Sequence, residues 1–127
     1  EQILQSAGIT VWVEVETQLD AVTAISGSGP AYFFLFIEAL QNAAIELGLD
    51  TDTAARLARQ TALGAATMAM DKDVTILRQQ VTSKGGTTQQ AIASFQQNDL
   101  QKLVTQATQA AATRSVELAD ELAADNT

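Results

Sequence analysis

Residues 27–47 read GSGPAYFFLFIEALQNAAIEL, and this stretch decides the fold that we predict. Pro30 suits the first turn of a helix, and Gly48 marks the end of that helix. Apart from one narrow polar stripe, the whole circumference of the helix is apolar. The stripe consists of Glu38, Gln41, Asn42 and Glu46. A helix of this kind must be buried on most sides, and in a chain of 127 residues we expect full burial to require a second chain.

The pattern stays helical up to the C-terminus. Residues 50–53 offer N-cap side chains for a helix that runs to about Met70 and is rich in small residues. We expect a short helix over 74–81, another over 87–96, and a last one over 100–124 that Asn98 and Asp99 cap. The sequence therefore predicts a mostly α fold, a bundle of about five helices.

The first residues follow a different pattern. Residues 2–7 form a short amphipathic stretch, and residues 10–15 (TVWVEV) have the β-branched and aromatic side chains of a strand. A single strand is not stable alone, because its backbone donors and acceptors need a partner. We therefore expect one orphan N-terminal strand, with residues 1–20 as the end of a larger domain and residues 21–127 as the helical domain.

The composition excludes several classes of function. The chain has a net charge of −8 and no cluster of basic residues, which disfavours nucleic acid and anionic membrane surfaces as partners. It has no cysteine, which excludes thiolate metal sites, and no histidine, which removes the usual general base. Because we find no signal peptide and no apolar run of bilayer length, we expect a cytoplasmic protein without a membrane partner or a metal site.

Residues 83–88 (SKGGTT) are the best candidate for a binding site. The two glycines allow successive N–H groups to converge, and the start of a helix adds its positive end. Such a loop suits a small carboxylate. The alternative is a plain capping box between Thr87 and Gln90, and the two interpretations are compatible.

Two further patterns carry less weight. Residues 27–29 resemble the start of a dinucleotide fingerprint, but its third glycine position is Tyr32 and no βαβ unit follows. Asp71 and Asp73 lack the further oxygen ligands that a cation site needs.

Two segments together resemble the pyrroline-5-carboxylate reductases. Residues 23–32 (TAISGSGPAY) resemble the entry to the first helix of the family's helical domain. Residues 81–88 (VTSKGGTT) resemble its signature loop, usually V-T-S-P-G-G-T-T. Residues 77–80 and the spacing between the two motifs also fit, so the resemblance covers nearly the whole chain.

The resemblance implies an enzyme that reduces 1-pyrroline-5-carboxylate to L-proline with NADPH or NADH, the last step of proline biosynthesis. It implies an N-terminal Rossmann domain for the nucleotide, of which residues 1–20 would be the end. The helical domain would form an interleaved homodimer, which in bacterial members can assemble into rings. Without the Rossmann domain this chain would bind no cofactor and would not turn over.

By position, the resemblance also assigns the substrate site. The loop would hold the substrate carboxylate, and the Thr88 hydroxyl, as the catalytic group, would lie near the ring nitrogen. The substrate-binding residues would be Val81, Ser83, Gly85, Gly86, Thr87 and Thr88.

The chain departs from the family pattern at two places. Lys84 replaces the proline of the signature loop, and Val74 replaces a proline commonly found a few residues before that loop. Lys84 either adds positive charge near the carboxylate or points to water. One alternative function is a non-catalytic helical dimerisation or interaction module. Another is a different imine or β-hydroxyacid dehydrogenase, against which the signature loop argues.

Overall fold

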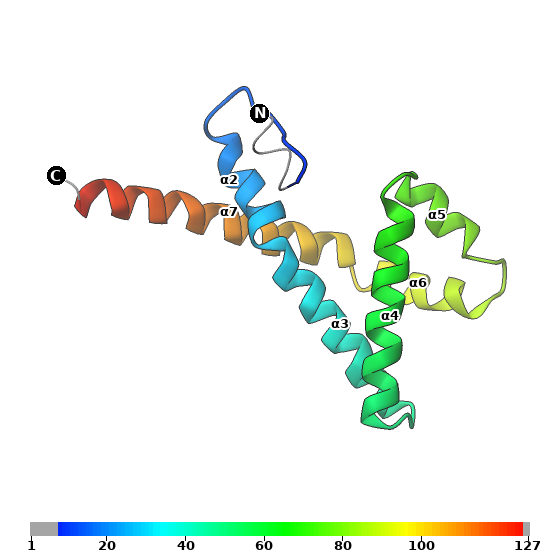
Figure 1. The fold of residues 1–127 in the computed structure, drawn as a ribbon. Helices are drawn as coiled ribbons and strands as arrows, with labels where there is room; N and C mark the ends of the chain where they lie inside the picture. The colour runs from blue at the N-terminus through cyan, green and yellow to red at the C-terminus, as the bar shows by residue number, and fades with distance from the viewer. Residues whose placement is uncertain (1–7, 126–127) are drawn as a thin grey trace. The chain divides into compact units, whose positions relative to one another are not determined.

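The computed structural model describes residues 8–125 and is mostly helical (Figure 1). The five predicted helices correspond to α3–α7, and a short helix and a π-helical turn precede them. The elements are α2 (Gln18–Val22), η1 (Thr23–Gly27), α3 (Gly29–Glu46), α4 (Thr51–Ala69), α5 (Val74–Gln80), α6 (Thr87–Gln97) and α7 (Leu100–Asp125).

The chain divides into two compact units. One contains the described residues up to Gly29 together with α7 from Gln106 onward, and therefore holds α2 and η1. The other is Pro30–Thr105, which holds α4, α5, α6, nearly all of α3 and the start of α7. The second unit carries every residue of the predicted site.

The ends of α3 follow from local chemistry. The Ser28 N–H donates to the Thr23 carbonyl at 2.9 Å, a π-helical bond that leads into α3, where Pro30 is the second residue. At the other end, Gly48 takes a φ of 98°. Its N–H donates to Ile45 at 2.9 Å, and the Leu49 N–H donates to Ala44 at 3.1 Å, which is a Schellman motif. The predicted stop at Gly48 is confirmed.

Aspartate side chains cap the next two helices. The Asp50 carboxylate accepts from the Thr53 N–H at 3.0 Å and starts α4. The Asp73 carboxylate accepts from the N–H groups of Thr75 and Ile76 at 2.8 and 3.0 Å and starts α5. Asp73 is thus a helix cap. Within residues 8–125 no group of three or more acidic, histidine or cysteine side chains could hold a metal ion.

Two sequence expectations fail at the edges of helices. Residues 10–15 form no strand, and the described part of the chain contains none. The physical reason is that a strand needs a second extended strand to pair with, and the described residues form only helices and the turns and irregular segments between them. Asn98 and Asp99 were both expected to cap α7. Asp99 directly precedes α7, and its carbonyl accepts from the Leu103 N–H at 3.1 Å, whereas the Asn98 amide donates to the Ser94 carbonyl at the end of α6, at 2.9 Å. The amphipathic stretch over residues 2–7 lies outside the described residues.

Large apolar side chains remain uncovered. Among the described residues, the buried apolar side chains are those of three alanines and one leucine: Ala24, Ala54, Ala58 and Leu77. On α3, Phe33, Phe34 and Leu35 are 72%, 68% and 67% exposed. The rings of Phe36 and Phe95, at a centroid distance of 6.1 Å, join α3 to α6. The apolar circumference of α3 is therefore only partly covered by its own chain. No helix between residues 8 and 125 combines the length and the hydropathy needed to cross a membrane.

Candidate functional site

The loop at residues 81–86 is fastened to the end of α5. The Val81 N–H donates to the Leu77 carbonyl at 3.2 Å, which closes the last turn of the helix. The Thr82 hydroxyl then donates to the Arg78 carbonyl at 2.5 Å, and its N–H to Gln79 at 3.1 Å. These bonds satisfy the last carbonyls of α5 and set the point where the loop leaves the helix.

A tight turn follows over residues 83–86. The Gly86 N–H donates to the Ser83 carbonyl at 3.1 Å, and Gly85, the third residue of the turn, has a φ of 74°. A positive φ at this position is the mark of a type II turn and strongly favours glycine. A Cβ on Gly86 would lie 2.4 Å from the Ser83 Oγ and 3.2 Å from the Ser83 carbonyl oxygen. A side chain is therefore disfavoured at Gly85 by the backbone angle and at Gly86 by the contact with Ser83.

The predicted capping box at Thr87 and Gln90 is wrong in its register. The N-cap of α6 is Gly86, and no side chain fills the cap. Instead, the Gln89 side chain reaches back and accepts from the Gly85 N–H at 2.6 Å. Thr87 was expected as the cap because its hydroxyl suits that role, but the turn at residues 83–86 places it one residue inside the helix.

The start of α6 carries three backbone donors without acceptors. The first helical bond runs from the Gln90 N–H to the Gly86 carbonyl at 3.4 Å. The N–H groups of Thr87, Thr88 and Gln89 precede it and donate to no group in the described part of the chain. Unpaired amides and the helix dipole together attract an anion. This is the feature of the loop that suits a carboxylate.

The predicted site residues lie together in this loop and the first turn of α6. Val81 is 60% exposed, Ser83, Gly85 and Thr87 are exposed, and Gly86 and Thr88 are half-buried. The hydroxyls of Ser83, Thr87 and Thr88 make no hydrogen bond to another described residue. Hydroxyl donors and amide donors are thus available on one short stretch.

The charge around the loop is a signal that the sequence motifs do not show. The chain as a whole carries −8, yet residues 74–98 contain no aspartate or glutamate. The basic residues of that segment are Arg78, in the last turn of α5, and Lys84, in the turn. The local balance therefore favours an anion, and a charge count by segment would have found it.

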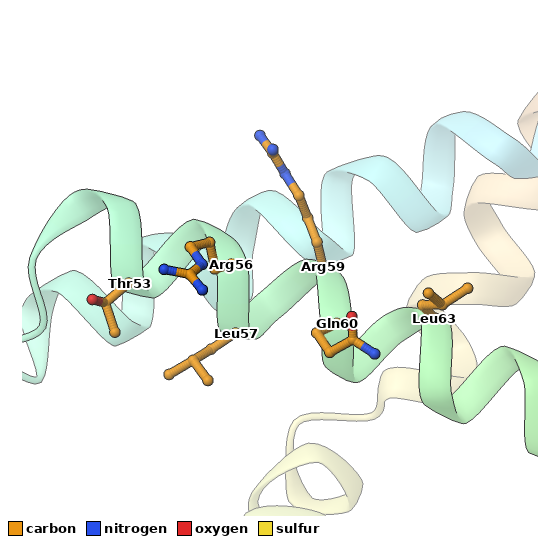
Figure 2. Close-up of a pocket in the computed structure, with 6 residues that line it drawn as sticks. All are labelled: Thr53, Arg56, Leu57, Arg59, Gln60 and Leu63. Carbon is orange, nitrogen blue, oxygen red and sulfur yellow. The ribbon is translucent and has the colours of Figure 1, made fainter.

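Two hollows lie elsewhere in the second unit. The larger one, of about 610 Å³, runs along a single helix, α4, and is shown in Figure 2. Its lining residues are Thr53, Arg56, Leu57, Arg59, Gln60 and Leu63. A smaller one of about 350 Å³ lies between α3 and α4 and includes Phe34, Ile37 and Arg59. Neither includes a residue of the loop, and both lie over helix faces that the chain leaves open.

The described residues do not fit a dinucleotide. Residues 27–32 lead from a π-helical turn directly into α3, with Tyr32 in the helix where the fingerprint has its third glycine. The fingerprint requires a strand before the glycines, and residues 8–125 form none.

Comparisons with known proteins agree on one family. The family model for the pyrroline-5-carboxylate reductase dimerisation domain matches residues 16–118. A pyrroline-5-carboxylate reductase from Pseudomonas aeruginosa is 54% identical over 123 residues, which are 95% of this chain and 45% of that protein. One from Haemophilus influenzae is 47% identical over 121 residues, 93% of this chain and 45% of that protein.

Solved structures give the same result. A pyrroline-5-carboxylate reductase from Coxiella burnetii superposes with a TM-score of 0.88 at 49% identity, covering 93% of this chain and 44% of that one. A pyrroline carboxylate reductase from Plasmodium falciparum, solved with NADP bound, superposes with a TM-score of 0.79 at 36% identity, covering 90% of this chain and 44% of that one. The chain spans less than half the length of these relatives. On this evidence, the chain belongs to the pyrroline-5-carboxylate reductase dimerisation family.

Proposed function

We propose that residues 21–127 are the dimerisation and substrate-binding domain of an enzyme that reduces 1-pyrroline-5-carboxylate to L-proline with NADPH or NADH. The observation that carries this proposal is the set of unpaired amides at the start of α6, in the loop that resembles the family's signature. The Plasmodium falciparum relative has NADP bound. In this chain's parent, a separate nucleotide-binding domain supplies that cofactor.

The proposed dimer follows from the uncovered apolar surface. Phe33, Phe34 and Leu35 are each about two-thirds exposed or more, and each ring or isobutyl group gains roughly 1.5–3 kcal/mol when it is fully buried. Large apolar side chains exposed to this extent indicate an interaction surface. A second copy whose helices interleave with these covers α3 on the sides that its own chain leaves open.

The loop binds the substrate through its carboxylate. The carboxylate accepts from the N–H groups of Thr87 and Thr88 and from the Ser83 hydroxyl, while Gly86 lets it approach the backbone closely. Val81 offers its exposed side chain to the apolar ring. The Thr88 hydroxyl donates to the ring nitrogen, which draws electron density from the carbon–nitrogen double bond and makes the ring carbon a better hydride acceptor.

The test is a titration of the isotope-labelled chain with L-proline, the expected product, followed by NMR. We expect the amide signals of Thr87 and Thr88 to shift. Thr88→Ala should weaken binding about ten- to hundredfold, because a hydrogen bond to a charged or polarised group contributes roughly 1.5–3 kcal/mol. Thr88→Ser keeps the hydroxyl and should bind nearly as the parent does. Thr75→Ala, a threonine of α5 outside the loop, is the matched control.

Sedimentation measured on the same samples separates the two candidate functions. A dimer that binds proline through the loop supports the reductase domain. A dimer whose loop amides do not respond to proline supports a non-catalytic dimerisation module instead. If Thr88→Ala and the parent chain bind proline equally, the assignment of Thr88 is wrong.

A further inference from the structure

Lys84 occupies a position in the turn where the fold makes little use of it. It is the second residue of the turn that the Gly86 N–H closes on the Ser83 carbonyl. Its side chain is exposed and forms no ion pair or hydrogen bond with the described residues. Proline is favoured at the second position of such a turn, and the family motif usually has proline there. Lysine forgoes that stiffness and adds a charge.

The charge stands out against its surroundings. Residues 74–98 contain no acidic side chain in a chain of net charge −8. Arg78, the other basic residue of the segment, has a structural explanation, because a cation in the last turn of α5 stabilises the negative end of that helix. Lys84 lies outside any helix, so the helix dipole does not explain it.

The distance from Lys84 to the unpaired amides is short. The turn brings the Cα atoms of Ser83 and Gly86 within about 7 Å of each other, and Gly86 is the residue before Thr87. The lysine ammonium sits on a flexible four-carbon stem. It can therefore lie within roughly 10 Å of a carboxylate on the α6 amides, a distance over which charges interact at low salt.

We propose that Lys84 is a specificity-determining residue of the loop, which favours ligands of net negative charge over zwitterions of the same size. The inference rests on the proposed function, since it assumes that the α6 amides bind a carboxylate. A monoanion carries a net negative charge, so the Lys84 ammonium attracts it. In a zwitterion, the ligand's own ammonium group cancels most of that attraction.

The experiment compares two ring carboxylates on the full chain by NMR titration. Cyclopentanecarboxylate is a monoanion with the ring size of proline, and L-proline is the zwitterion. At about 10 mM ionic strength, Lys84→Gln should weaken cyclopentanecarboxylate binding roughly two- to threefold and L-proline binding much less. In about 0.5 M salt the monoanion difference should shrink toward none, because screening shortens the range of the interaction.

Two further variants isolate the charge. Lys84→Pro removes the charge and also stiffens the turn. Because the charge is the cause of the effect, the affinity of this variant for cyclopentanecarboxylate should depend on salt as little as that of Lys84→Gln. Lys72→Gln removes one positive charge between Asp71 and Asp73, where neighbouring carboxylates offset it, and should leave both affinities unchanged.

The outcomes are distinguishable. If the parent chain binds both ligands and Lys84→Gln binds cyclopentanecarboxylate as tightly as the parent at low salt, this inference is overturned and the proposed function stands. The inference also fails if Lys72→Gln shows the same loss as Lys84→Gln, because the effect is then one of net charge. If the parent binds neither ligand, both the proposed site and this inference are overturned.

Discussion

The N-termini of α4 and α6 solve the same problem in opposite ways. Every helix begins with backbone donors that have no partner within the helix. At α4 the chain supplies a carboxylate of its own, because Asp50 accepts from the Thr53 N–H at 3.0 Å. At α6 the N-cap is Gly86, which has no side chain, and the first three amides remain without an acceptor in the described residues. One terminus is complete within the chain, and the other is open to a carboxylate from outside.

If this difference is correct, an aspartate at the N-cap of α6, like Asp50 at α4, should block the α6 amides to an outside carboxylate. Gly86→Asp should place a carboxylate over the α6 amides, because Gly86 has the extended backbone of an N-cap, with φ −80° and ψ 169°. The built-in carboxylate would occupy the amides and repel an incoming anion. We expect the affinity for L-proline or cyclopentanecarboxylate to fall about a hundredfold, roughly 2.7 kcal/mol, in an NMR or calorimetric titration.

Gly86→Ala is the control for the added Cβ, which approaches the Ser83 Oγ and carbonyl oxygen. This variant should lose stability to that crowding. Gly86→Asp should recover part of the loss, since an N-cap side chain contributes about 0.5–2 kcal/mol. Stability that rises from alanine to aspartate while binding disappears is the expected signature. Unchanged binding in the aspartate variant would mean that the ligand does not use the α6 amides.

Gly85 allows a second test, because α3 ends on a glycine of similar conformation. Gly85 and Gly48 have φ values of 74° and 98°, and neither added Cβ would meet an atom within 4 Å. Alanine at either position should therefore lower the free energy of unfolding by about 1–2 kcal/mol, the cost of a left-handed backbone for an L-residue. Chemical denaturation measures this change.

Only one of these two variants should affect binding. Gly85→Ala strains the turn that presents the α6 amides, so it should weaken carboxylate binding as well as stability. Gly48→Ala strains the end of α3 and should leave the loop's affinity unchanged once the variant is folded. Equal effects of both variants on binding would show that the loop responds to global stability and not to its own turn.

Much of the fold could be predicted because its signals are local. Pro30, Gly48 and the aspartates before α4 and α5 act on backbone groups within a few residues, so helix bounds read from the sequence agree with the structure to within two residues. The loop at residues 83–86 could be identified for the same reason, because its glycines indicate a turn with a positive φ, and Gly85 has one.

What could not be predicted depends on groups farther away or on a competition between neighbours. The register of the α6 cap was decided by the turn, which left Thr87 inside the helix and gave the capping bond to Gln89. A strand over residues 10–15 requires a partner strand, which no property of those residues can supply. The apolar surface of α3 was recognised, but its extent became measurable only when the exposure of Phe33 and its neighbours was known.

The smallest predicted effect is a dependence on pH at the closed terminus. The hydrogen bond from the Thr53 N–H is the main cause that lowers the pKa of Asp50 below its ordinary value of 3.8. A lowered pKa in the folded state means that the carboxylate contributes stability above pH 3.8, and that this contribution is lost as the pH falls through the folded value. Asp50→Asn caps the helix without ionising.

The difference in melting temperature between the parent and Asp50→Asn should therefore favour the parent near pH 6 and shrink or reverse near pH 2.5. Taking the difference removes the contribution of the other acidic residues. At α6, the parent should show no such step from its own N-cap, because Gly86 cannot titrate, whereas Gly86→Asp should acquire one. If the difference between the parent and Asp50→Asn does not change with pH, or if Gly86→Asp shows no more pH dependence than the parent, the contrast between a terminus that carries its own carboxylate and one that is open to a ligand's carboxylate is wrong.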